Sequence, residues 1–153
     1  MTPLNESDAV QELLDKAAIA KLIHTVARAM DARDWDQLTT CFVPEAVGDF
    51  PNAVVDSRDA IVAGMKGLLE PLNATQHLVA NINVSVEGDT ATAHATFMAQ
   101  HVRAAADGNG HYIMGGDYDD NFRRTDDGWK FTRRQIRGIW SDGDPSVMAI
   151  PVS

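Results

Sequence analysis

One carboxylate, Asp31, falls where a helix would bury apolar side chains. In the stretch HTVARAMDARDWDQL (24–38), Asp31 follows Ala27 by one helical turn, and Ile23 precedes Ala27 by another. The three side chains therefore share one stripe of the helix. A buried carboxylate is costly unless it is paired or hydrogen bonded. Two interpretations stay open: a solvated residue at a helix end, or a charge kept inside for chemistry.

His77 is the second candidate for chemistry. It opens the alternating stretch HLVANINVSV (77–86), with Asn81 and Asn83 on its side of the predicted strand. Imidazole changes charge near neutral pH and can serve as a general base. The plain alternative is a strand histidine with a satisfied hydrogen bond. Of the other histidines, His111 begins a predicted strand and could reach the mouth of a pocket.

Arg134 lies on the last predicted strand, WKFTRRQIRGIW (129–140), and shares one side of it with Ile136 and Trp140. A guanidinium in such surroundings could stabilise an enolate or a departing anion. An ion pair with the acidic preceding strand explains it equally well. Candidate substrate contacts on these strands are His111, Tyr112, Tyr118 and Trp140.

Composition narrows the class of protein. The 153 residues carry a net charge of −9, with 22 acidic against 13 basic residues. That balance argues against a nucleic-acid backbone or an anionic membrane as partner. We find no metal-ligand spacing, no phosphate-binding loop and one cysteine, Cys41, so we expect no cofactor, no metal and no disulfide. With no signal-like N-terminus and no apolar run near ~18 residues, we expect a cytoplasmic protein.

The secondary structure that must position these residues is predicted to change from helices to strands along the chain. Apolar spacing predicts a helix over 7–32 with a break near 15–17, a second from Asp34 ended by Pro44, and a third from Ser57 to Pro71. In the second helix, Trp35, Leu38, Cys41 and Phe42 would face inward. Alternation then predicts strands over 77–86, 90–102, 111–124 and 129–140. Helices followed by a strand meander indicate an α+β protein, a single domain over residues 1–153.

Two motifs carry a family resemblance. MDARDWDQLTTCFVPEA (30–46) and GGDYDDNFRRTDDGWKF (115–131), with QHLVANINV (76–84), resemble the SnoaL-like members of the nuclear transport factor 2-like superfamily. The resemblance covers about residues 10 to 140. It implies a cone-shaped fold, with three N-terminal helices packed in a curved mixed or antiparallel sheet. Within the superfamily, the chain is most similar to scytalone dehydratase and hexachlorocyclohexane dehydrochlorinase.

The resemblance also implies a site. Those enzymes use an aspartate, a histidine and, in the dehydrochlorinase, an arginine, which match Asp31, His77 and Arg134 here. Paired with Asp31, one nitrogen of His77 would be protonated and the other free as a base. The sequence departs from scytalone dehydratase, which has two tyrosines on its helical side; here Tyr112 and Tyr118 both lie on a strand.

The function that follows is a cofactor-independent lyase or isomerase. It would remove a carbon-bound proton from a small hydrophobic cyclic substrate, as a dehydratase, dehydrohalogenase, isomerase or cyclase does. The alternative is a non-catalytic binding or structural subunit, such as a dioxygenase β subunit, because one fold hosts many functions. In either case we expect a homodimer or homotrimer.

Overall fold

The computed structural model describes residues 5–104 and 110–149. Its elements follow in the order α1 (Glu6–Ala32), α2 (Trp35–Thr40), β1 (Phe42–Phe50), β2 (Ala53–Val55), α3 (Arg58–Leu69), β3 (Ala74–Glu87), β4 (Thr90–Val102), β5 (His111–Thr125), β6 (Gly128–Gly143) and the 3-10 helix η1 (Pro145–Met148). No helix in these two ranges is long and apolar enough to cross a membrane.

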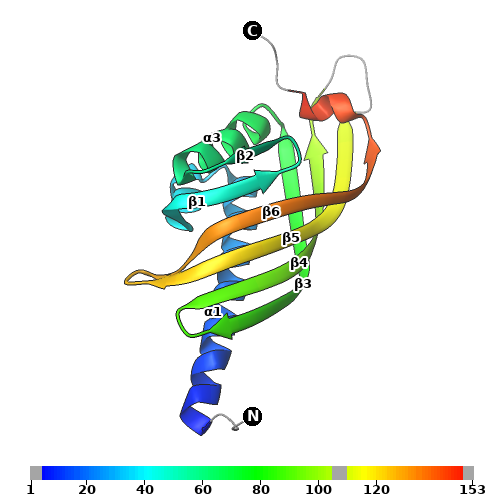
Figure 1. Cartoon of the computed structure of the whole chain (residues 1–153). Coiled ribbons are helices and arrows are strands. Elements are labelled where there is room, and N and C mark those ends of the chain that lie inside the picture. The colour runs from blue at the N-terminus through cyan, green and yellow to red at the C-terminus, as the bar shows by residue number, and fades with distance from the viewer. Residues whose placement is uncertain (1–4, 105–109, 150–153) are drawn as a thin grey trace.

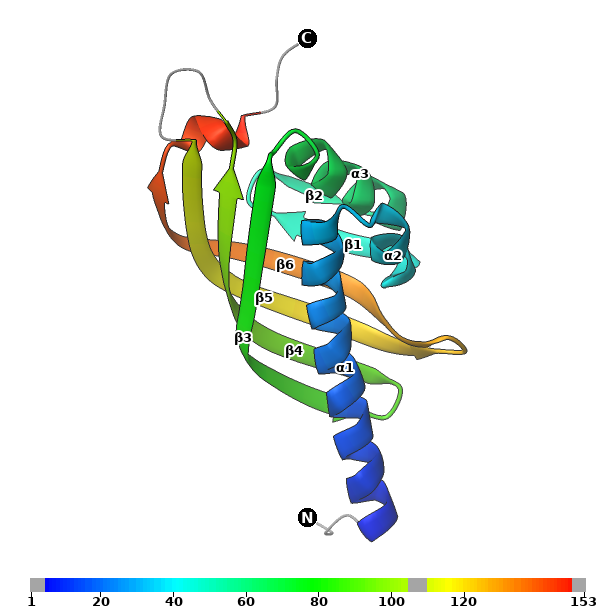
Figure 2. The same cartoon turned by 180° about the vertical axis from the view of Figure 1, so that it is seen from behind.

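The strands form one six-stranded sheet in the order β2-β1-β6-β5-β4-β3. All neighbours are antiparallel except β1 and β6, which run parallel, so the sheet is mixed. Figure 1 shows the long strands β3 to β6 curving together, with η1 at their upper end. Figure 2, from behind, shows α1 crossing the concave side of this sheet, with α2 and α3 beside its upper end. The predicted α+β class with a curved sheet is confirmed.

Helix α1 is continuous, so the break predicted near residues 15–17 is wrong. Asn5 caps it by accepting a hydrogen bond from the Asp8 backbone, and Arg33 ends it in the left-handed conformation. Asp15, in the region of the expected break, accepts two hydrogen bonds of 2.8 Å from Arg124 and one of 3.0 Å from the Trp129 ring nitrogen. These contacts hold the middle of the helix against the β5–β6 hairpin, so the helix continues through residues 15–17.

The prediction of three helices before any strand is only partly right. Helix α2 begins after Asp34, whose side chain caps Gln37, but it ends at Thr40. Phe42, expected on the inner face of this helix, begins β1, and Pro44 lies inside that strand. The pairing of β1 with β6 shifts register between Phe42 and Val47, and such irregular stretches tolerate a proline that cannot donate. Strands β1 and β2 therefore precede α3.

Strand β3 does not alternate as simply as its sequence suggests. Its pairing with β4 shifts between Ala80 and Asn83, and Asn81 has a positive φ of 53°. This bulge reverses the alternation. His77 and Val79 face inward before it, and Ile82 and Val84 face inward after it. The prediction that Asn81 and Asn83 lie on the same side of the strand as His77 is therefore wrong, because both are exposed whereas His77 faces inward; Leu78 is exposed as well.

Candidate functional site

The end of α1 and the start of β3 bring Asp31 and His77 together. The His77 ring nitrogen Nδ1 lies 2.6 Å from Asp31 Oδ1, and the His77 backbone N–H donates to Asp31 Oδ2 at 2.9 Å. The Thr75 hydroxyl donates to Oδ1 at 3.0 Å. The carboxylate thus accepts three hydrogen bonds, all from β3, so its orientation is fixed by the strand that carries the histidine.

Electrostatics keep Asp31 ionised. Burial alone would raise the pKa of its carboxyl, but the hydrogen bonds from the His77 ring and backbone, the charge of His77 and the Thr75 hydroxyl together lower it. An ionised carboxylate can only accept, so the hydrogen shared with His77 belongs to Nδ1. When the ring carries one hydrogen, that hydrogen is on Nδ1, and Nε2 is the nitrogen free to accept a proton. The His77 side chain is 7% exposed and that of Asp31 25%.

A second histidine, His101, lies beside His77. Their ring centroids are 5.8 Å apart, with the rings edge to face. His101 Nδ1 lies 3.2 Å from the Tyr112 carbonyl oxygen, which can accept its hydrogen. Burial and the neighbouring His77 lower the pKa of His101 to about 4. At neutral pH His101 is therefore an uncharged polar side chain in the interior.

Next to the pair, the concave face of the sheet is lined by apolar side chains. Phe97, Ala99 and Tyr118 form a buried cluster separate from the main core, and Val79, Met114 and Ile136 pack against it. His77 pairs with Ala99 across the strands, and Ala99 pairs with Met114. The Tyr118 ring stacks on Phe97 with centroids 4.4 Å apart, and burial raises the pKa of Tyr118 to about 12. The surroundings of His77 on the sheet are thus apolar.

Arg134 is engaged by another partner. Its Nε and Nη2 donate to the two carboxylate oxygens of Asp120 at 2.9 and 2.8 Å, and the guanidinium lies 3.9 Å from the Tyr118 ring centroid. Both side chains are at most 1% exposed. Of the two interpretations of Arg134, this geometry matches the ion pair with the acidic strand.

The convex face of the sheet holds the residues that the fold leaves apart from the Asp31–His77 pair. Trp140 pairs with Gly115 and covers it so closely that a side chain there would clash with the indole. His111 is exposed, in a hollow of about 110 Å³ that Gln100, Ile113, Asp142 and Gly143 also line. Neither Trp140 nor His111 is therefore brought to the pair, whereas Tyr112 contacts His101. A second hollow lies at the N-terminal turns of α1. Asp31 and His77 line neither of these two hollows.

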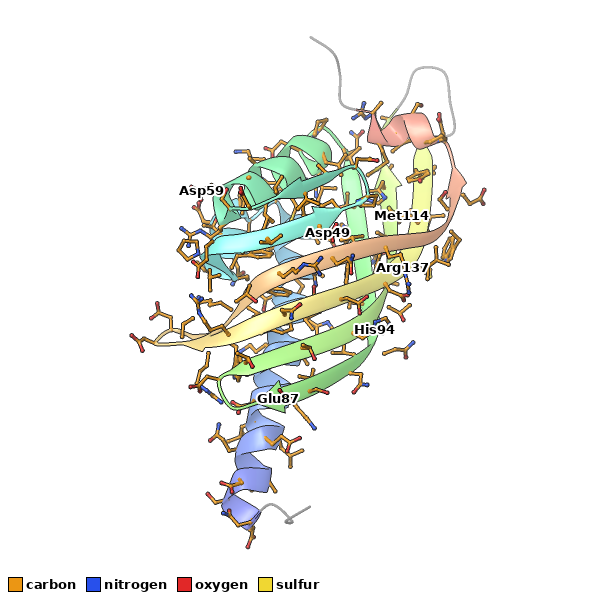
Figure 3. All side chains as sticks on the ribbon, in the orientation of Figure 1. Asp49, Asp59, Glu87, His94, Met114 and Arg137 are labelled. Carbon is orange, nitrogen blue, oxygen red and sulfur yellow. The ribbon has the colours of Figure 1, made fainter. Side chains whose placement is uncertain are left out.

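A second histidine–carboxylate pair lies on the convex face. His94 Nδ1 is 2.8 Å from Asp119 Oδ1, and Asp117 bonds Arg137 at 2.8 Å. Figure 3 looks onto this face, with His94 and Arg137 labelled. The Asp119 hydrogen bond raises the pKa of His94. This exposed pair has the same chemical groups as Asp31 and His77 without the apolar surroundings.

Sequence reasoning missed Thr75 and His101. Thr75 and His77 are two apart on one strand, so they share a face, which was the available signal for Thr75. His101 pairs with Thr75 in the antiparallel register, which no pattern in the sequence gives. Among the described residues, no group of three histidine, cysteine or acidic side chains is placed to hold a metal ion.

The chain belongs to the SnoaL-like domain family, whose sequence profile matches residues 11–135. It is 32% identical over 128 residues to an uncharacterized protein of Mycobacterium tuberculosis, an overlap that covers 82% of this chain and 86% of that protein.

Solved structures share the nuclear transport factor 2-like fold. One is a candidate scytalone dehydratase from Novosphingobium aromaticivorans, with a TM-score of 0.81 and 24% identity, covering 94% of this chain and 97% of that one. Another is the hexachlorocyclohexane dehydrochlorinase LinA-type3 from Novosphingobium barchaimii, with a TM-score of 0.78 and 14% identity, covering 94% and 99%. At such identities the likeness concerns the fold, and the predicted resemblance is confirmed at that level.

Proposed function

We propose that the protein is a cofactor-independent lyase or isomerase in which His77 removes a carbon-bound proton from a small hydrophobic cyclic substrate. The observation that carries the proposal is the 2.6 Å contact between His77 Nδ1 and Asp31 Oδ1 beside an apolar stretch of the concave sheet face. A base held in one tautomer, largely out of water, is what general-base catalysis requires.

In the proposed step, His77 Nε2 takes the proton from carbon while Nδ1–H stays bonded to Asp31. The electron pair of the broken C–H bond forms a double bond, and a leaving group such as hydroxide or halide departs, or an enolate forms and is reprotonated. Asp31 stabilises the imidazolium that results, because the ionised carboxylate lies next to the new positive charge. His77 then returns its proton to the leaving group, to another carbon of the product or to water.

The side chains near His77 set the substrate class. Phe97, Met114 and Ile136 offer apolar contact, and neutral His101, whose Nδ1–H faces the Tyr112 carbonyl, offers Nε2 as an acceptor for a substrate hydroxyl. We place Tyr112 and Tyr118 among the substrate contacts on the same grounds. Arg134, being paired with Asp120, holds Tyr118 in place in this proposal, and the developing anion is left to the hydroxyl groups of the two tyrosines, which can donate to it.

The test is an exchange and elimination assay on a panel of candidate substrates. The protein is incubated in D2O with cyclic ketones, β-hydroxy cyclic ketones and chlorinated cyclohexanes, including hexachlorocyclohexane. Mass spectrometry then detects deuterium uptake or loss of water or chloride. His77→Ala should slow the reaction ~10²–10⁴-fold, and His94→Ala, which removes the exposed histidine of the other pair, is the matched control. Equal turnover by His77→Ala and wild type would refute the proposal.

A second candidate function is a non-catalytic subunit or binding module. The observation that favours it is a row of apolar side chains across the convex face: Leu78, Met98 and Trp140 are 56%, 42% and 46% exposed and follow one another in the pairing of β3, β4, β5 and β6. Such a row is typical of a surface that another chain covers. The same row supports the proposed homodimer or homotrimer, which an enzyme of this fold would also form. A ligand that raises the melting temperature of wild type and of His77→Ala alike, with no turnover, would favour the binding module.

A further inference from the structure

Both non-glycine residues with positive φ among those described flank the candidate pair. Arg33, two residues after Asp31, has φ 60°, and Asn81, four residues after His77, has φ 53°. The left-handed region costs an ordinary side chain about 1–2 kcal/mol. Asn81 forms the bulge in β3. Arg33 needs a different explanation, since a glycine would end α1 with less strain.

The side chain of Arg33 crosses from the end of α1 to β3. Its Nη1 donates to the Met30 carbonyl and to the Thr75 hydroxyl, each at 2.8 Å, and its Nη2 donates to the Leu72 carbonyl at 3.4 Å. The guanidinium is a donor only, so Thr75 Oγ1 must accept from it. The single hydroxyl hydrogen of Thr75 is then left for another acceptor.

That acceptor is Asp31. Thr75 Oγ1 lies 3.0 Å from Asp31 Oδ1, the oxygen that also faces His77 Nδ1 at 2.6 Å. The donors therefore follow in one direction, from Arg33 to Thr75 to the carboxylate. In the described part of the chain Arg33 makes no ion pair with Asp31, whose carboxylate faces the His77 ring at 2.6 Å. The arginine thus orients the carboxylate through the hydroxyl, and the negative charge of Asp31 remains available to His77.

We propose that Arg33 and Thr75 are positioning residues that fix the direction in which Asp31 faces and, through it, the nitrogen of His77 that is free to act as the base. The inference rests on the proposed function and adds two residues to it. Without the donation from Arg33, the Thr75 hydroxyl can rotate away from Asp31. Without the Thr75 hydroxyl, Asp31 Oδ1 has only the imidazole to hold it.

Substitutions at Thr75 and Arg33 separate this role from a structural one. Thr75→Val keeps the branched shape and removes the hydroxyl, whereas Thr75→Ser keeps the hydroxyl. Arg33→Gly suits the left-handed backbone and removes the guanidinium, so α1 can still end where it does. Thr25→Val is the matched control, because its hydroxyl bonds the Lys21 carbonyl within the same helix.

The readout is nuclear magnetic resonance of the His77 ring nitrogens and the Asp31 carboxyl carbon, which needs no substrate. We expect the wild type and Thr25→Val to hold the hydrogen on Nδ1. We expect Thr75→Val and Arg33→Gly to populate both tautomers and Thr75→Val to raise the pKa of the Asp31 carboxyl. Thr75→Ser should restore the wild-type spectrum. On any substrate found, kcat should fall about tenfold in Thr75→Val with KM little changed.

The outcomes distinguish the two proposals. Folded Thr75→Val and Arg33→Gly with the wild-type tautomer and the wild-type Asp31 titration would overturn the positioning role and leave His77 as the base. If Thr75→Val does not fold, a wild-type tautomer and a wild-type Asp31 titration in folded Arg33→Gly would by themselves overturn the positioning role. A wild-type His77 with its hydrogen on Nε2 would overturn the proposed function itself.

Discussion

Replacing Asp31 by asparagine separates the shape of this side chain from its charge. The amide oxygen can accept from one donor, but its NH2 group then faces another donor, because the carboxylate accepts from Thr75, the His77 backbone and the His77 ring. The variant also cannot stabilise an imidazolium as an anion does. We therefore expect Asp31→Asn to keep the fold and to lose turnover.

The magnitude follows from the contact at 2.6 Å. A hydrogen bond to a charged group contributes roughly 1.5–3 kcal/mol, and about 1.4 kcal/mol corresponds to a tenfold change in rate. Asp31→Asn should thus slow proton removal roughly 10- to 150-fold. His77→Ala should slow it by the ~10²–10⁴-fold expected of a missing general base.

The assay is deuterium uptake or elimination on the substrate that the panel identifies, with circular dichroism to show that each variant is folded. Because Asp31 and His77 act as a unit, the double variant should be little slower than the slower single variant. Folded Asp31→Asn that turns over at the wild-type rate would refute the reasoning, and Asp31 would then be an ordinary residue at a helix end.

Three further predictions concern stability, metals and assembly. The pKa of Asp15 is lowered from 3.8 to about 2, first by its hydrogen bonds with Arg124. The pair therefore stabilises the fold above about pH 4 and loses that effect as the pH falls toward 2. Asp15→Asn should lower the free energy of unfolding by roughly 2 kcal/mol at neutral pH. In chemical denaturation at a series of pH values, the variant should therefore lose less stability than wild type between about pH 4 and 2; an equal loss in both proteins would contradict this. Turnover should survive exhaustive chelation, and its loss with recovery on adding a divalent metal would count against the proposed chemistry. In sedimentation, wild type should be a dimer or trimer at micromolar concentration and Trp140→Glu largely a monomer; a monomeric wild type would rule out assembly through this face.

The sequence by itself determined the elements that local periodicity encodes. Long α1, with its apolar stripe through Ile23 and Ala27, and the four long strands β3 to β6 follow from spacing, because side-chain direction repeats with the backbone period. Asp31 and His77 could be singled out from residue type and spacing, since a carboxylate on an apolar stripe demands a partner. Their role came from the family resemblance, whose motifs carry both residues.

Only the tertiary structure decided the rest, because it depends on pairing between distant segments. The local sequence predicts a helix at Phe42, but pairing with β6 makes this residue the start of strand β1. The bulge at Asn81 likewise depends on the register with β4. The same pairing places His101 beside His77 and sends Trp140 to the convex face, although it shares a strand with Arg134. Arg33 reaches Thr75 only because α1 ends against β3. These contacts are set by the free energy of packing the whole sheet around α1, which no local stretch of sequence contains.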